Sequence, residues 1–153
     1  MTGAASHEFP LRVYYEDTDA AGMVYHANYL KFAERGRSEM LRSLGFPHRK
    51  LGGEDGVGFA VRRCTIDYLA PARLEDALTV VTTLTDIGAA TLKARQEIRR
   101  DGELLADLDI LVACIGRDGR PRRLPSALRA ALSSEGRASE GRASEGLPRA
   151  RAP

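Results

Sequence analysis

The chain has 153 residues, of which 43% are hydrophobic, and its formal net charge is +2. This size suits one domain with a buried core, and the near balance of charge excludes a global basic field for nucleic acid. No apolar run is long enough to span a membrane, and no basic stretch followed by an apolar one opens the chain. We therefore expect a cytoplasmic protein that neither binds nucleic acid nor spans a membrane.

Alternating hydrophobic residues predict a first strand from Phe9 to Tyr15. A long helix follows, which Asn28 can cap and which Gly45, with Pro47 just beyond, can end. One side of this helix forms a broad stripe, as is typical of a helix covered by a curved sheet. The stripe holds Leu30, Ala33, Arg37, Met40, Leu41 and Leu44.

Four further strands are predicted after the helix, and short turns connect them. Asp101-Gly102 is a hairpin signal between the last two strands. The four strands are expected over residues 64–68, 78–84, 91–99 and 104–114. In the third of them, one face holds Leu92, Ala94, Gln96 and Ile98.

The order of one strand, one helix and four strands predicts an α+β fold. An antiparallel sheet of about five strands would wrap around the single long helix. Such a sheet has edge strands, and an unpaired edge invites association. We therefore expect a homodimer that extends the sheet edge to edge, or a homotetramer built as a dimer of dimers.

The chain after the last strand is expected to form a short helix over residues 126–132. The domain would then comprise residues 1–132. Beyond it, the five-residue unit Ser-Glu-Gly-Arg-Ala repeats from Ser134. A segment of this composition has too little apolar surface to offset its ordering entropy, so residues 133–153 are expected to form a disordered low-complexity tail.

The loop between the first strand and the helix gathers the residues that can carry chemistry. Asp17 and Asp19 lie in it, Gly22 permits a turn, and His26 lies just before the helix. The first amides of a helix have no internal acceptor and carry partial positive charge, so they can stabilise a developing oxyanion. A carboxylate beside such amides suits attack on a thioester. On local chemistry alone, the two aspartates could equally cap a turn and His26 could be structural.

Other catalytic signatures are absent from the sequence. It contains no G-x-S-x-G elbow, no P-loop, no G-x-G-x-x-G and no H-E-x-x-H. Cys64 and Cys114 lie in apolar strand patterns and are expected to be reduced core residues. We therefore expect a reaction without metal. Arg117, Arg120, Arg122 and Arg123 form a basic set that is either a solvated loop or a site for nucleotide phosphates.

The segment R-V-Y-Y-E-D-T-D-A-A-G-M-V-Y-H-A-N-Y-L, from Arg12 to Leu30, closely resembles the active-site signature of the 4-hydroxybenzoyl-CoA thioesterase family, which has the hotdog fold. Within that family it looks most like the Tol-Pal system-associated acyl-CoA thioesterases. The resemblance continues through residues 31–42, 65–76 and 119–125 and ends near residue 130. One departure is Ala21, which stands where relatives often have glycine.

The resemblance implies an acyl-CoA thioesterase that acts at a dimer interface without a cofactor, since coenzyme A is part of the substrate. Asp19 would be the nucleophile or the general base for water, and the backbone N–H near His26 would polarise the thioester oxygen. Tyr25 and His26 would line the pocket, with Gly22 and Asn28 beside them. Arg120, Arg122 and Arg123 would bind the phosphates of coenzyme A.

Two alternatives remain open at this point. A hydroxyacyl-thioester dehydratase of the same fold would pair His26 with Asp19 for proton transfer. A non-catalytic partner of acyl thioesters or of acyl carrier protein in the cell envelope would bind without turnover. Thiol release, enoyl formation and binding alone distinguish the three.

Overall fold

The computed structural model of the protein describes residues 5–143. Its strands are β1 (Ser6–Arg12), β2 (Val57–Tyr68), β3 (Ala77–Ile87), β4 (Thr91–Arg100) and β5 (Glu103–Gly116). Its helical segments are η1 (Tyr15–Asp17), α1 (Asn28–Ser43), α2 (His48–Lys50), η2 (Leu51–Asp55) and α3 (Ser126–Ala143). No helix within the described range is long and apolar enough to cross a membrane.

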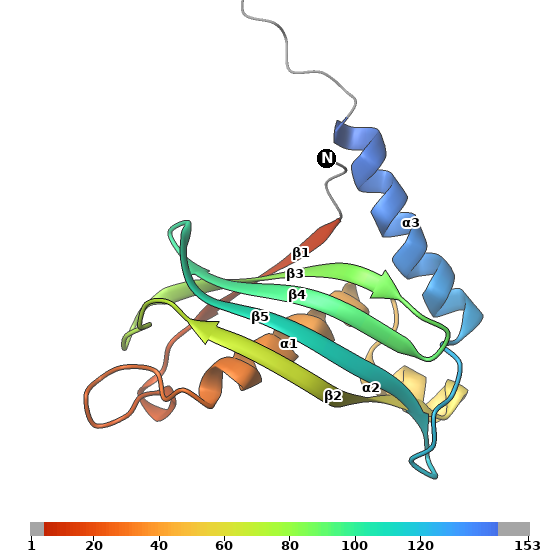
Figure 1. Ribbon diagram of the computed structural model, residues 1–153, viewed down its shortest axis with the longest axis horizontal. Coiled ribbons are helices and arrows are strands. Elements are labelled where there is room, and N and C mark those ends of the chain that lie inside the picture. The colour runs from red at the N-terminus through yellow and green to blue at the C-terminus, as the bar shows by residue number, and fades with distance from the viewer. Residues whose placement is uncertain (1–4, 144–153) are drawn as a thin grey trace, which may run out of the picture.

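The five strands form one sheet in the order β1-β3-β4-β5-β2, and every neighbouring pair is antiparallel. The long helix α1 runs along one face of this curved sheet, as Figure 1 shows. The α+β prediction of a five-stranded antiparallel sheet around one long helix is therefore confirmed. The predicted hairpin is confirmed too, since Asp101 and Gly102 both have positive φ between β4 and β5.

The buried face of α1 differs in part from the predicted stripe. Tyr29, Phe32 and Gly36 are buried with Ala33 and Leu41. Leu30, by contrast, is 42% exposed, so its assignment to the core was wrong.

Two glycines shape this helix. Gly45 has φ +89° and ends α1 in a Schellman motif, in which the Gly45 N–H bonds the Arg42 carbonyl and the Phe46 N–H bonds the Leu41 carbonyl. Gly36 allows α1 to lie close to the sheet, since a Cβ there would be 2.6 Å from Val80 Cγ1.

A polar contact also joins α1 to the sheet inside the core. The Gln96 side chain is fully buried, and its Nε2 donates to the Ala33 carbonyl and to Thr82 Oγ1, each at 2.8 Å. Its Oε1 accepts from Arg37 Nη1 at 3.0 Å. Gln96 is thus satisfied on both sides of its amide, as a buried polar group must be.

The predicted ends of three segments require correction. The first strand ends at Arg12, and Tyr15 begins η1 instead of continuing the strand, because Asp17 accepts the Tyr14 amide and turns the chain. Asn28 does not cap α1; it is the first residue of the helix, and the N-cap position belongs to Ala27.

The third correction concerns the C-terminal helix, which continues to Ala143 rather than ending at 132. Leu128 and Leu132 are buried and anchor it, and adding further residues to an anchored helix requires no new nucleus. The expected tail thus begins with helical residues, and its part over 144–153 lies outside the described residues.

The two edges of the sheet have different properties. The β1 edge is short and carries Pro10, whose missing N–H makes it a poor partner for another strand. The β2 edge is twelve residues long and lacks proline. Large apolar side chains are exposed along it and just beyond, with Val61 52%, Tyr68 47% and Leu69 59% exposed. The β2 edge therefore has the properties of an association surface.

Candidate active site

The loop before α1 is a small antiparallel hairpin at one end of the sheet (Figure 1). A bridge joins Thr18 to Val24, the Asp19 N–H bonds the Met23 carbonyl at 2.8 Å, and the Tyr25 N–H bonds the Asp17 carbonyl at 2.9 Å. The Val24 N–H bonds the Ala72 carbonyl at 2.9 Å, which attaches this hairpin to the segment between β2 and β3. The loop residues are therefore fixed in position before any substrate arrives.

The two candidate aspartates have different environments in this hairpin. Asp17 is 8% exposed, and its Oδ2 accepts the Tyr14 N–H at 2.8 Å. Its backbone carbonyl also accepts from Asn28 Nδ2 at 2.8 Å. Asp17 therefore holds the loop together, which is a structural role.

Asp19 lies at the exposed tip of the hairpin. Its Oδ1 accepts the N–H groups of Ala21 at 2.8 Å and Met23 at 3.3 Å. Within residues 5–143, no group donates to its second carboxylate oxygen. Asp19 is thus oriented through one oxygen while the other is available to a substrate or a water molecule.

Gly22 has φ +78°, which closes the tip of the hairpin. Only glycine adopts this conformation without strain, so the Asp19 turn depends on it. The alanine at position 21 does not alter this turn, since its N–H donates to Asp19.

His26 lies between this hairpin and the start of α1. Its backbone carbonyl accepts the Tyr68 hydroxyl at 2.8 Å, which fixes the peptide that leads into the helix. Among the described residues, no acceptor receives the N–H groups of His26 and Ala27. These two amides lie at the positive end of the α1 dipole, the arrangement that stabilises an oxyanion.

Aromatic rings surround this helix start. The Tyr25 and His26 rings are 4.4 Å apart, and the Tyr68 ring is 6.5 Å from His26 and 5.4 Å from Tyr29. Burial raises the pKa of Tyr68 above its usual value, so its hydroxyl stays protonated and keeps donating to His26. Tyr25 and His26 are both exposed.

The predicted phosphate-binding arginines lie far from the Asp19 loop, at the other end of the fold. Arg120, Arg122 and Arg123 are exposed in the segment after β5. The Arg122 guanidinium is 3.5 Å from Asp118, and the Arg120 N–H bonds the Asp118 carboxylate. The end of β5 pairs with the start of β2, whereas Tyr68, at the end of β2, contacts His26. Twelve residues of strand, roughly 36 Å, therefore separate the two groups within one chain.

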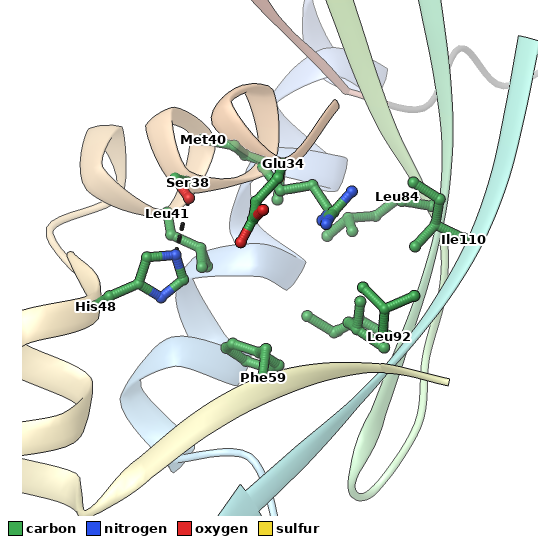
Figure 2. Close-up of a pocket in the computed structure, with 13 residues that line it drawn as sticks. Glu34, Ser38, Met40, Leu41, His48, Phe59, Leu84, Leu92 and Ile110 are labelled. Carbon is green, nitrogen blue, oxygen red and sulfur yellow. Dashed lines mark hydrogen bonds between the residues drawn. The ribbon is translucent and has the colours of Figure 1, made fainter. Parts of the chain in front are cut away.

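A pocket of about 70 Å³ lies between the C-terminal half of α1 and the inner face of the sheet (Figure 2). Phe59, Leu84, Leu92 and Ile110 form its apolar sheet side, while its helix side carries polar residues beside Met40 and Leu41. The polar residues are Glu34, Arg37, Ser38 and His48, and Ser38 Oγ is 2.8 Å from His48 Nε2. Burial lowers the pKa of Arg37 from its usual value, while the charge of Glu34 raises it.

Sequence patterns did not identify this pocket. Phe59, Leu84 and Ile110 are indistinguishable from ordinary core residues in a strand pattern. The one available signal was Gln96, a polar residue on an otherwise apolar strand face, whose side chain accepts a hydrogen bond from the half-buried Arg37. Both cysteines are free thiols as predicted, with Cys114 buried and its pKa raised by burial.

Comparison with known proteins identifies the family. The model of the thioesterase-like superfamily matches residues 13–132. The chain is 42% identical over 124 residues to the acyl-CoA thioesterase YbgC of Haemophilus influenzae, covering 80% of this chain and 91% of that one. It is 44% identical to the acyl-CoA thioester hydrolase YbgC of Escherichia coli O6:H1, covering 80% and 92%.

Solved structures agree with this result. A probable thioesterase from Bartonella henselae has a TM-score of 0.77 and 41% identity, and the match covers 79% of this chain and all of that one. The resemblance predicted from the sequence and the hotdog fold that it implied are both confirmed. With the matching model spanning most of its length, the chain belongs to the thioesterase-like superfamily.

Proposed function

We propose that the protein hydrolyses acyl-CoA thioesters to the free acid and coenzyme A, with Asp19 as the reacting carboxylate. The observation that carries this proposal is the hydrogen bonding of the Asp19 carboxylate. One of its oxygens is held by two backbone amides and the other has no donor among the described residues. The names of the relatives from Haemophilus influenzae and Escherichia coli support the same substrate class.

Asp19 and the start of α1 have different roles in the reaction. The thioester oxygen accepts hydrogen bonds from the free N–H groups of His26 and Ala27, which stabilise its negative charge as the carbonyl carbon is attacked. Asp19 either attacks that carbon itself, forming an anhydride that water then opens, or takes a proton from an attacking water. In both routes the C–S bond breaks, the thiol leaves after protonation, and no cofactor takes part.

The assembly that we propose is a dimer paired through the β2 edges. Identical strands related by a two-fold axis within one continuous sheet run antiparallel, so the start of β2 in one protomer lies beside the end of β2 in the other. The pocket, with Phe59 and Val61 in its lining, adjoins the first half of β2, whereas His26 contacts Tyr68 at the end. Each pocket would then serve the Asp19 loop of the opposite subunit.

The same pairing gives the arginines a role. Antiparallel pairing brings the segment with Arg120, Arg122 and Arg123 toward the partner's helix start, although it lies far from the helix start of its own chain. Guanidinium groups bind phosphates with good geometry. We propose that these residues hold the coenzyme A phosphates of a thioester bound at the other subunit's Asp19.

The test of Asp19 is the Asp19→Asn variant in a thiol-release assay. Asparagine keeps an oxygen that can accept from Ala21 and Met23, so the hairpin should persist while the carboxylate is lost. We expect the turnover rate to fall on the order of 100-fold or more. The control is Glu16→Gln, which removes an exposed carboxylate from the same loop and should leave the rate unchanged. Wild-type turnover by Asp19→Asn would refute the assignment.

A single-turnover reaction in heavy-oxygen water tests the nucleophilic route. If Asp19 attacks the carbonyl carbon, opening of the anhydride by water at the acyl carbon leaves the Asp19 carboxylate unlabelled, whereas opening at the aspartyl carbon labels it. Mass spectrometry of the peptide with Asp19 reads the label directly. Label in the peptide therefore establishes the nucleophilic route.

The dehydratase alternative predicts a different product. A dehydratase removes water from a hydroxyacyl thioester and releases no thiol. It requires a histidine and a carboxylate that act together. Among the described residues, no hydrogen bond joins Asp19 to His26, and the Asp19 carboxylate accepts only from the amides of Ala21 and Met23. This favours hydrolysis, and an assay of thiol against enoyl product decides between the two.

A further inference from the structure

We propose that the pocket beside α1 selects a short acyl chain carrying a hydroxyl group, and that Arg37 is the residue that recognises the hydroxyl. This inference rests on the proposed function and specifies its substrate class. Three features carry it: the size of the pocket, the apolar side that the sheet supplies and the incompletely paired guanidinium on the helix side.

The volume of the pocket indicates the length of the acyl chain that it can hold. Its volume is about 70 Å³. A single water-sized group occupies roughly 10–15 Å³ by this kind of measure, so the pocket accommodates about five non-hydrogen atoms. This matches the part of a short acyl group that extends beyond the thioester carbonyl.

The sheet side of the pocket is apolar, and the polar residues of the lining lie on the helix side, beside Met40 and Leu41. Figure 2 shows Phe59, Leu92 and Ile110 facing Glu34 across the space between the sheet and α1. The hydrocarbon part of a ligand would lie against the sheet, where it replaces water at apolar surface. Its polar substituent would then face the helix.

Arg37 has unused hydrogen-bonding capacity in this pocket. Within the described residues, its guanidinium makes one hydrogen bond, from Nη1 to Gln96 Oε1, and has no carboxylate within ion-pair distance. A guanidinium has five N–H donors, and a partly buried cation without a full set of acceptors is destabilising. A ligand oxygen that accepts from Arg37 would relieve this cost.

The neighbouring groups favour a hydroxyl over a carboxylate. Glu34 also lines the pocket, and its charge raises the pKa of Arg37 against the lowering effect of burial. A ligand carboxylate would be repelled by Glu34, whereas a hydroxyl accepts from Arg37 and can donate to Glu34. Ser38 and His48 already bond each other, so they compete less for the ligand.

The test compares 3-hydroxybutyryl-CoA with butyryl-CoA, and 3-hydroxyhexanoyl-CoA with hexanoyl-CoA, by thiol release. For the wild type, kcat/KM for the hydroxylated member of each pair should be about tenfold to a hundredfold higher, as for a hydrogen bond to a charged group. In Arg37→Met this ratio should fall to about one for both pairs.

The matched control is Arg35→Met, which removes an exposed arginine from the same helix outside the pocket and should keep the wild-type ratio. If Arg37 only ties α1 to Gln96, its substitution lowers the melting temperature and slows all four substrates equally, which overturns the proposal. A wild-type ratio near one overturns it too, but leaves the hydrolase assignment intact. Failure to release thiol from any of the four substrates refutes both.

Discussion

At the scale of single residues, the hairpin before α1 separates two aspartates that look alike in the sequence. Asp17 is buried and holds three parts of the loop together through its side chain and its carbonyl. Asp19 is exposed and oriented by only one of its oxygens. The difference arises from burial and hydrogen bonding, which local sequence does not encode.

Asn28 is the residue whose structural role can be tested most simply. Its side-chain amide donates to the Asp17 carbonyl in a buried position. Asn28→Ala removes that donor, and we expect a loss of about 1–2 kcal/mol in the free energy of unfolding because a buried acceptor loses one of its partners. Turnover should fall as well, since the bond joins the hairpin to the helix start. Denaturant unfolding and thiol release measure the two effects, and unchanged values for both would contradict this account.

At the scale of secondary-structure elements, the contact between α1 and the sheet fixes the position of the helix start. Gly36 makes that contact close, and Gln96 Nε2 donates both to the Ala33 carbonyl of the helix and to Thr82 Oγ1 in the sheet. The helix cannot slide along the sheet without breaking both. The amides of His26 and Ala27 are therefore held in place by packing more than a turn away.

Gly36→Ala tests this contact. The added Cβ would be 2.6 Å from Val80 Cγ1 and 3.3 Å from Gln96 Nε2, so the helix or the strand must move. We expect a destabilisation of about 1–3 kcal/mol, as for an overpacked core. Gly52→Ala is the matched control, because its Cβ would meet nothing within 4 Å. Equal melting temperatures for the two variants would show that α1 packs less closely against the sheet at Gly36 than the structure indicates.

The pairing of β4 with β5 has a pH-dependent component. The hydrogen bond from Arg95 lowers the pKa of Asp107. Because the folded pKa lies below the unfolded value, the contribution is complete above the unfolded pKa of about 4 and is lost as the pH falls through the folded pKa. Asp107→Asn should therefore lower stability at pH 7 by less than about 1 kcal/mol, since the pair is partly exposed, and the difference should shrink toward pH 2. A difference in melting temperature that stays constant from pH 7 to pH 2 would contradict this.

The same elements show what the sequence could and could not predict. Strand alternation identified β4 and the buried position of Gln96, and the positive-φ glycine at position 45 ended α1 as predicted. The sequence did not reveal the pocket, because it needs side chains from α1, β2, β3, β4 and β5 to meet, and only tertiary structure brings them together. The buried face of α1 was predicted only in part, since helical periodicity alone does not show how far a curved sheet reaches around the helix.

At the scale of the whole molecule, each protomer has its pocket and its Asp19 loop in opposite halves. The centre of the pocket lies near Arg37, nine residues into α1 from Asn28 and so roughly 14 Å from the helix start. The β2 edge, with its exposed Val61 and Tyr68, provides a surface through which a second copy can complete the site. The proposed dimer thus accounts for both the exposed edge and the separation of the two halves.

The most direct test of a site shared between two subunits is subunit complementation in the thiol-release assay. Asp19→Asn disables the carboxylate, and Ser38→Trp fills the pocket from the helix side. Each variant alone should be nearly inactive. A mixed dimer joins an intact Asp19 from one subunit to an open pocket from the other, provided that the site is shared between subunits.

Random reassociation of equal amounts makes half of the dimers mixed, and each of these has one working site. We therefore predict that the mixture recovers about a quarter of the wild-type activity. If each subunit used its own pocket, both sites of the mixed dimer would be disabled. Activity no greater than the sum of the two inactive variants, with mixed dimers demonstrated by native mass spectrometry, would contradict the shared site.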